Sequence, residues 1–253
     1  MFVAERRGTV FLLLGMMAWV VVAFAVAAVG AAVVGLTAAC LRILIGAEAI
    51  PSVSPLGYVL SAATGFQATL LLAALRQGRL AGGGNRRVGL GAGPVRRKGT
   101  VALLCAATIV WLAAFMFMMN RFPALRDFAK SVAPGGLSDL TGASTVVEVA
   151  RVVLVAALAP VSEELFFRGW LWEALRRREH TVVATVCLTA IPWLLLHGID
   201  APGRILFLIP AAVVFSLARH LGGSVRASLA THMTNNGIAI LVQSVMMLFS
   251  DGG

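Results

Sequence analysis

Long apolar runs recur along the whole chain, and they constrain its fold more than any other feature of the sequence. Apolar runs of about 18 residues or more are typical of helices that cross a bilayer. Only 13% of the 253 residues are charged and 59% are hydrophobic, whereas a soluble domain has roughly 25% charged residues. The composition therefore excludes a water-soluble fold and predicts an all-α polytopic membrane helix bundle.

About seven transmembrane helices are predicted, at residues 9–44, 56–75, 100–119, 152–175, 181–197, 204–219 and 226–248. The first segment could be one long helix or two short ones. A single crossing keeps the basic loops on the cytoplasmic side, as the positive-inside rule requires, and two crossings would place them outside. We therefore expect one long first helix and an external C-terminus. With no visible repeat or soluble segment, residues 1–253 are expected to form a single membrane domain.

The net charge of +10 is concentrated in one loop. Between residues 76 and 98 the chain carries basic residues and no acidic one: Arg76, Arg79, Arg86, Arg87, Arg96, Arg97 and Lys98. Beside membrane helices such a cluster marks the cytoplasmic side and attracts anionic lipid. We therefore expect the lipid bilayer as a partner and no nucleic acid. The high content of Ala, Gly and Arg indicates a GC-rich bacterial genome, so the predicted location is the bacterial inner membrane.

Ionisable side chains inside a bilayer cost several kcal/mol, so each one in a predicted span needs a function or a partner. Such polar residues gather in the last four segments, as Glu163, Glu164, Arg168, His197, His232 and Asn236. The first three segments hold little beyond Arg42 and Gln67. The catalytic core is therefore expected in residues 141–250, with residues 1–140 forming accessory helices and the basic cytoplasmic loop.

The sequence Glu163-Glu164-Leu-Phe-Phe-Arg168 lies near the middle of a predicted span. Neighbouring helical residues point about 100° apart, and a base four residues after an acid lies on the same face. The spacing therefore predicts that Arg168 neutralises Glu164 and leaves Glu163 to face a cavity. The alternative is a charge cluster that only joins helices, although two acids and one base would leave a carboxylate unpaired.

Three further polar residues are predicted at a similar depth. His197 ends an apolar segment, and His232 and Asn236 are four residues apart, which places them on one helix face. A carboxylate can act as a base toward water, and an imidazole can share the proton. A second imidazole and an amide N–H can stabilise a developing oxyanion. The combination favours hydrolysis, although each residue alone could serve helix packing.

These clusters resemble the motifs of the CPBP family, which comprises CAAX proteases, bacteriocin-processing enzymes and abortive-infection-type proteins. The family pattern Glu-Glu-x-x-x-Arg is intact at 163–168, and His-x-x-x-Asn is intact at 232–236. In the intervening Phe-x-x-x-His motif, Trp193 replaces the usual Phe before His197. We expect this replacement to affect an aromatic neighbour and no catalytic group. The resemblance covers about residues 140–245.

The resemblance implies an intramembrane endopeptidase that hydrolyses a peptide bond of a membrane-associated peptide or protein. Glu163 and His197 would activate water. His232 and Asn236 would form the oxyanion site, with Glu164 and Arg168 in support.

The family has been described both as zinc-dependent and as glutamate-dependent without metal. Glu163, His197 and His232 could supply a zinc ligand set, but the sequence lacks a His-Glu-x-x-His helix. We therefore expect a mechanism that requires no cofactor.

Two other functions remain open at this point. The same polar cluster could hold together a non-catalytic membrane scaffold or immunity protein, or it could relay protons in a transporter. The chain shows no repeated halves of the kind that many transporters contain. A cavity that is reachable from the bilayer or cytoplasm and lined by Glu163 and both histidines would favour the enzyme over the scaffold.

Overall fold

The computed structural model describes residues 2–45, 55–132, 145–199 and 201–250. These residues are helical apart from short connections, with no strand among them. The N-terminal half contains α1 (Phe2–Ile45), α2 (Pro55–Ala81), the short α3 (Arg86–Gly89), α4 (Lys98–Arg121) and α5 (Pro123–Val132). The C-terminal half contains a long composite helix, followed by α9 (Val182–His197), α10 (Arg204–Gly222) and α11 (Val225–Ser250).

The composite helix runs without interruption from residue 145 to residue 176. It consists of α6 (Thr145–Val153), the π-helical η2 (Leu154–Leu158), α7 (Ala159–Glu163), the π-helical η3 (Glu164–Leu171) and α8 (Trp172–Arg176). π-Helical segments inside α-helices occur frequently at functional sites. The predicted Glu-Glu-x-x-x-Arg motif lies at the boundary between α7 and η3.

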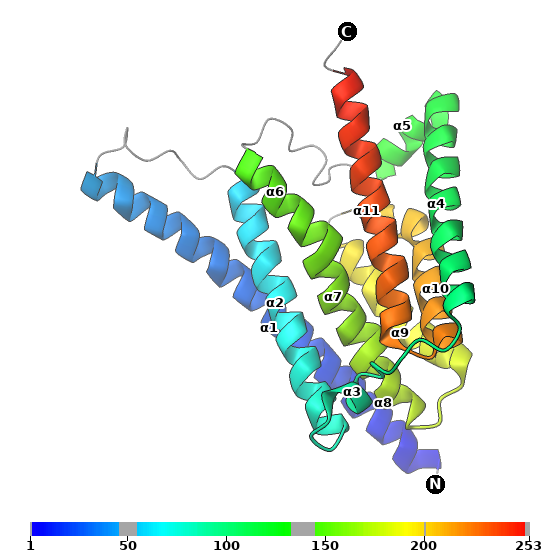
Figure 1. Ribbon diagram of the computed structural model, residues 1–253. Helices are drawn as coiled ribbons and strands as arrows, with labels where there is room; N and C mark the ends of the chain where they lie inside the picture. Colours follow the sequence, from blue (N-terminus) through cyan, green and yellow to red (C-terminus); the bar gives the residue numbers. More distant parts are fainter. Residues whose placement is uncertain (1, 46–54, 133–144, 200, 251–253) are drawn as a thin grey trace.

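Each of the seven predicted segments coincides with a helix, and α3 and α5 are short helices that the sequence did not predict. In the part of the chain that the structure describes, four helices are long and apolar enough to cross a membrane, at Gly8–Ile45, Gly57–Ala81, Lys98–Arg121 and Arg204–Gly222. The count of seven crossings remains a prediction. The first apolar run forms one helix, α1, as expected. At 1.5 Å per residue its 44 residues extend for about 66 Å, and Figure 1 shows it reaching beyond the bundle.

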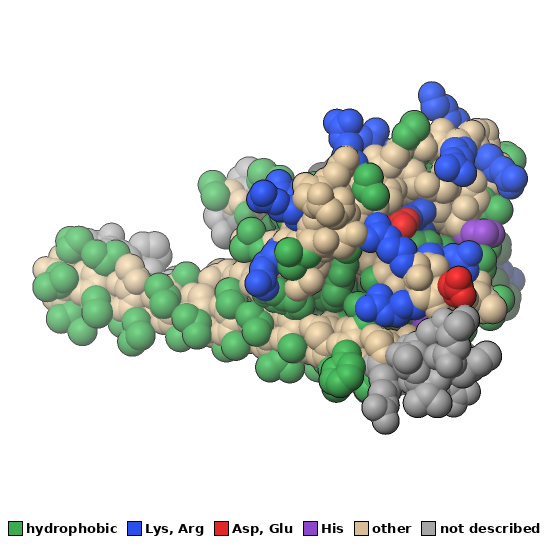
Figure 2. Space-filling view, turned by 90° about the horizontal axis from the view of Figure 1, so that it is seen from below, with side chains coloured by type: hydrophobic (Ala, Val, Ile, Leu, Met, Phe, Trp, Pro, Cys, Tyr) green, Lys and Arg blue, Asp and Glu red, His purple; other side chains and the backbone are tan. Residues whose placement is uncertain are grey.

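The basic residues gather at one end of the bundle, which we call the basic end. The segment between α2 and α4 packs there against the turn between α10 and α11, because Val225 N–H donates to Gly91 O and Arg96 N–H donates to Gly222 O, both at 3.0 Å. Figure 2 views this end and shows Lys and Arg side chains spread over it. The C-terminal end of α8, with its three consecutive arginines, lies at the same end (Figure 1). The shared location agrees with the charge distribution that the topology prediction requires.

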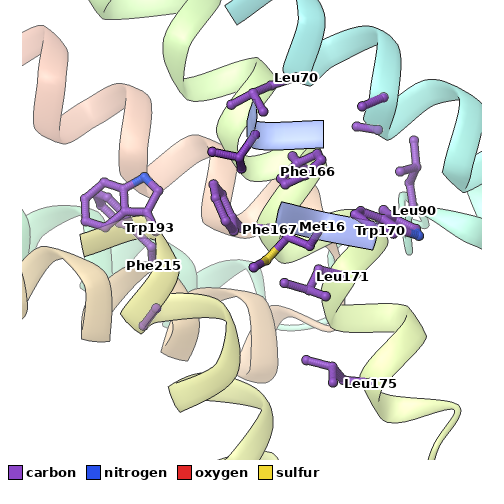
Figure 3. Close-up of a cluster of buried hydrophobic side chains, with 14 of the residues drawn as sticks. Met16, Leu70, Leu90, Phe166, Phe167, Trp170, Leu171, Leu175, Trp193 and Phe215 are labelled. Carbon is purple, nitrogen blue, oxygen red and sulfur yellow. The ribbon is translucent and has the colours of Figure 1, made fainter. Parts of the chain in front are cut away.

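A cluster of buried aromatic and aliphatic side chains fills the bundle toward the basic end (Figure 3). Its largest members come from α1, α2, the composite helix, α9 and α10: Met16, Leu70, Phe166, Phe167, Trp170, Leu171, Leu175, Trp193 and Phe215. Because lipid tails are as apolar as these side chains, close packing and not water exclusion holds such helices together in a bilayer. The cluster therefore fixes the composite helix against α2 and α9.

Candidate active site

A cavity of about 400 Å³ lies between α2, the composite helix, α9, α10 and α11. Its walls include all four residues predicted to be catalytic, Glu163, His197, His232 and Asn236. These residues come from three separate helices, so the fold brings together what the sequence separates by up to 73 positions. The lining matches the part of the enzyme criterion that concerns Glu163 and both histidines.

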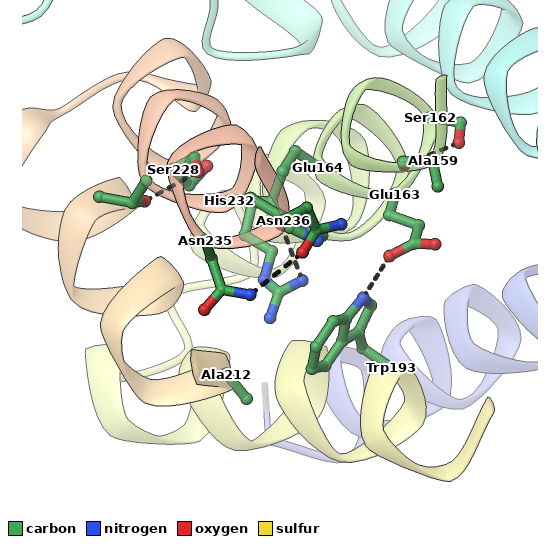
Figure 4. A network of polar contacts seen from close by, with 12 residues as sticks. Ala159, Ser162, Glu163, Glu164, Trp193, Ala212, Ser228, His232, Asn235 and Asn236 are labelled. Carbon is green, nitrogen blue, oxygen red and sulfur yellow. Dashed lines mark hydrogen bonds and ion pairs between the residues drawn. The ribbon is translucent and has the colours of Figure 1, made fainter. Parts of the chain in front are cut away.

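The side chain of Glu163 is buried, with 5% of the residue exposed. Both of its carboxylate oxygens are hydrogen-bonded. Oε1 accepts from Nε2 of Gln67 at 2.8 Å, and Oε2 accepts from Nε1 of Trp193 at 2.6 Å. Figure 4 shows the indole directed at this carboxylate. Because both partners are N–H donors, each carboxylate oxygen acts as an acceptor, as an ionised carboxylate does. The two donors hold the carboxylate in one orientation.

Gln67 is a site residue to which the sequence analysis assigned no role. Its Oε1 accepts from the hydroxyl of Ser162, so the amide spans two neighbouring residues of the composite helix. The carboxylate can only accept, which fixes the amide with its nitrogen toward Glu163. The site therefore takes a residue from α2, and the expectation that the last four helices hold it alone is incomplete. The sequence did contain a signal for this role, because Gln67 is a polar residue inside a predicted transmembrane span.

The expectation that Trp193 contacts no catalytic group is wrong, because its indole N–H bonds to Glu163. The phenyl ring that the family pattern has at this position carries no N–H and could not make this bond. The guanidinium of Arg168 lies 5.0 Å from the indole ring centre, a cation–π distance. Trp193 therefore contacts two of the three charged residues of the Glu-Glu-x-x-x-Arg motif, Glu163 and Arg168.

His197 presents its outer nitrogen to Glu163. Its Nδ1 lies 2.9 Å from the carbonyl oxygen of Trp193, which can only accept, so Nδ1 carries the hydrogen. In the neutral ring Nε2 is then an acceptor, and it lies 3.8 Å from Oε2 of Glu163. This separation is too long for a direct hydrogen bond. Two acceptors therefore face each other across a gap in the cavity wall.

Glu164 and Arg168 form the predicted pair, with Nη1 and Oε1 separated by 3.1 Å and both side chains fully buried. The same Oε1 lies 2.9 Å from Nδ1 of His232, a contact that the sequence did not predict. The His232 ring also stacks on Phe215, with ring centres 4.3 Å apart. Glu164 and Phe215 together fix the plane of this imidazole, whose ring also lines the cavity.

Asn236 lines the cavity and also joins α11 to the composite helix. Its Nδ2 donates to the carbonyl of Val155 at 2.9 Å. In η2 the N–H of Ala159 bonds to Leu154, and Pro160 has no N–H to offer, so the Val155 carbonyl needs a donor from elsewhere. One amide hydrogen of Asn236 is therefore bonded to the composite helix.

Asn235, the neighbour of Asn236 on α11, also lines the cavity. Its Nδ2 donates to Oδ1 of Asn236 at 3.1 Å. Figure 4 shows the two amides side by side on α11.

The alternative zinc ligand set fits this geometry poorly. Within the part of the chain that the structure describes, no group of three or more His, Cys, Asp or Glu side chains is placed to hold a metal ion. His232 directs its Nδ1 to Glu164, so only its Nε2 could bind a metal.

Comparison with protein families matched residues 145–238 to the family described as Type II CAAX prenyl endopeptidase Rce1-like. The matched stretch contains all three motifs and excludes Gln67. Comparisons with curated proteins and with solved structures gave no match. Together with the apolar helices, the family match identifies the chain as an integral membrane protein.

Proposed function

We propose, from the premise that residues 145–238 form a Rce1-like domain of the CPBP family, that this protein is an intramembrane endopeptidase. The observation that carries the proposal is the gap of 3.8 Å between Oε2 of Glu163 and Nε2 of His197 at the cavity wall. Two acceptors at this spacing are matched by one water molecule that donates a hydrogen bond to each.

The first chemical step is attack by this water. As its oxygen bonds to the scissile carbonyl carbon, a water proton passes to Glu163 or His197, which act as the general base pair. The hydrogen bonds from Gln67 and Trp193 keep the carboxylate aimed at the water throughout. When the tetrahedral intermediate collapses, the C–N bond breaks and the proton moves from the same pair to the leaving nitrogen.

The carbonyl oxygen becomes negatively charged during attack, and it needs donors. The second amide hydrogen of Asn236 and Nε2 of a protonated His232 serve this purpose, since both residues line the cavity. Glu164 supports the protonated ring because its Oε1 already accepts from Nδ1. Arg168 balances the charge of Glu164 within the dry interior. Donors placed in advance toward a developing oxyanion are typically the largest electrostatic contribution to such reactions.

The scaffold function receives less support from this geometry. In a cluster that only joined helices, the polar groups would need to contact only one another. Glu163 is bonded to Gln67 and Trp193, but it also lies across a gap from His197 at the wall of a cavity. The zinc-dependent mechanism would need converging ligands, which the described residues do not offer. We therefore propose a reaction that needs no metal, in a bacterial inner membrane, on a membrane-associated peptide or protein.

A comparison of membrane peptides tests the function. Host membranes carrying the wild-type protein, Glu163→Gln or Glu179→Gln are incubated with membrane peptides encoded by the same genome, and new N-termini are identified by mass spectrometry. Glu179 is an exposed carboxylate beyond the composite helix and serves as the matched control. We expect new N-termini with the wild type and Glu179→Gln only. Equal sets of N-termini in all three samples would contradict the proposal. Activity lost on chelation and restored by zinc would contradict the metal-free mechanism.

A further inference from the structure

The cavity extends from Glu163 in one direction only. On the composite helix its lining residues are Arg151, Leu154, Val155, Ala159 and Glu163, all at or before the catalytic carboxylate. The other helices agree, since Ala63 lies in the first half of α2, His197 is the last residue of α9 and Leu208 lies early in α10. These parts of the helices meet at the end of the bundle opposite α3 (Figure 1).

The bundle is closed between Glu163 and the basic end. The residues that follow Glu163 on the composite helix are buried without interruption from Phe166 to Trp172. Beneath them Arg219 donates to the carbonyl of Arg168 at 2.7 Å and pairs with Glu173. The aromatic cluster of Figure 3 occupies the same region. Among the described residues, packed side chains therefore fill the route from the basic end to Glu163.

The distribution of charge assigns the basic end to the cytoplasm. The Lys and Arg side chains at this end lie in or beside three separate connections of the chain: Arg76, Arg79, Arg86, Arg87, Arg96, Arg97, Lys98, Arg176, Arg177, Arg178, Arg219 and Arg226. Cytoplasmic loops carry such an excess of Lys and Arg, and the excess sets the orientation of the protein. The opposite end, toward which the cavity extends, then lies outside the cytoplasm.

We infer that the cavity is entered from the extracytoplasmic side, and that the substrate is a membrane-anchored peptide whose scissile bond lies outside the cytoplasm or in the outer leaflet. This inference rests on the proposed function. Arg151 near the entrance is twelve residues from Glu163, which corresponds to about 18 Å along the helix. An extended chain covers about 3.3 Å per residue, so the substrate needs an unfolded stretch of about five residues. A cytoplasmic C-terminus of any kind would not reach the site.

Site-directed labelling tests the direction of entry without requiring activity. In a Glu163→Gln background with Cys40, Cys105 and Cys187 replaced by Ala, one cysteine is introduced at Ala159 inside the cavity. Lys98→Cys, exposed at the basic end, and Leu103→Cys, 73% exposed on the apolar surface of α4, are the matched controls. A membrane-impermeant sulfonated thiol reagent is applied to spheroplasts and to inside-out vesicles. Asn235→Cys, a second cavity position, replaces Ala159→Cys if that variant does not fold.

We expect the cavity cysteine to react in spheroplasts at least 10-fold faster than in inside-out vesicles, Lys98→Cys to show the opposite preference, and Leu103→Cys to react in neither. A cavity cysteine that reacts only in inside-out vesicles, or in neither preparation, would overturn the inference. The peptide comparison described above supplies a second test, because cleavage sites on the cytoplasmic side would also overturn it. Absence of any cleavage would instead refute the proposed function and leave the labelling result intact.

Discussion

The indole N–H of Trp193 donates to Oε2 of Glu163 at 2.6 Å, and the same oxygen is the one that faces Nε2 of His197 at 3.8 Å. The donor thus holds the oxygen that would orient the attacking water. A hydrogen bond to a charged group is worth about 1.5–3 kcal/mol, so its loss has a measurable effect on the rate.

Trp193→Phe is therefore expected to lower kcat by roughly 10- to 100-fold while the protein remains folded. The phenyl ring preserves most of the packing against Phe215 and Arg168 and removes only the N–H donor. The measurement is kcat on a cleaved peptide, with the melting temperature as a check of folding. Trp111→Phe, on the exposed side of α4, is the control. An unchanged kcat in Trp193→Phe would show that this hydrogen bond does not orient the base.

Gln67→Leu is expected to reduce kcat to a similar extent, although position 67 lies outside the family match. The substitution keeps the size of the side chain and removes the donor to Glu163 and the acceptor for Ser162. Gln77→Leu, ten residues later on the same helix, should have little effect. Equal activities of the two variants would mean that α2 only packs against the site.

Much of this candidate site could be predicted because polar residues are easy to recognise within apolar helical segments. An ionisable or amide side chain within an apolar segment is costly, so it needs a function or a partner. This signal identified Glu163, His197, His232 and Asn236. The helix spacing also predicted the pair of Glu164 and Arg168, because positions four apart share a face on any helix.

The contacts between distant helices were not predictable in this way. That Gln67 bonds to Glu163 depends on how α2 packs against the composite helix, which no local pattern specifies. The role of Trp193 was missed because the sequence shows an aromatic residue but not the direction of its N–H. The hydrogen bond from Asn236 to Val155 depends on the π-helical register before Pro160. A proline is compatible with that register, but its presence in the sequence does not predict it.

Removal of Arg168 should destabilise the fold more than removal of the whole pair. Arg168→Ala leaves Glu164 buried without its cation, and breaking a buried pair in this way typically costs about 3–5 kcal/mol. Glu164→Gln combined with Arg168→Met removes both charges and should recover folded yield, although activity stays low because Glu164 also holds His232. Folded yield is measured by size-exclusion chromatography in detergent. Similar yields for the single and the double variant would contradict the proposed role of the pair.

The stability of the fold should depend on pH through Glu148. The hydrogen bond from Arg151 lowers the pKa of Glu148 below its usual range. Since the folded-state pKa is the lower one, the bond stabilises the fold above the usual pKa of glutamate, and this contribution is lost as the pH falls through the folded-state value. Glu148 is partly exposed, so the effect on melting temperature should be at most about 2–4 °C. Melting curves of wild type and Glu148→Gln should differ at pH 7 and converge as the pH falls through the folded-state pKa of Glu148; a constant difference would exclude this linkage.

The most direct test of the central claim is single-turnover cleavage of an identified substrate by the purified wild type and Glu163→Gln. The amide is nearly isosteric with the carboxylate and removes a buried charge, so the variant should fold as well as the wild type. The account predicts that Glu163→Gln binds the peptide and leaves it intact, whereas the wild type cleaves it. Cleavage at the wild-type rate by Glu163→Gln would show that Glu163 is not the base and would contradict the account.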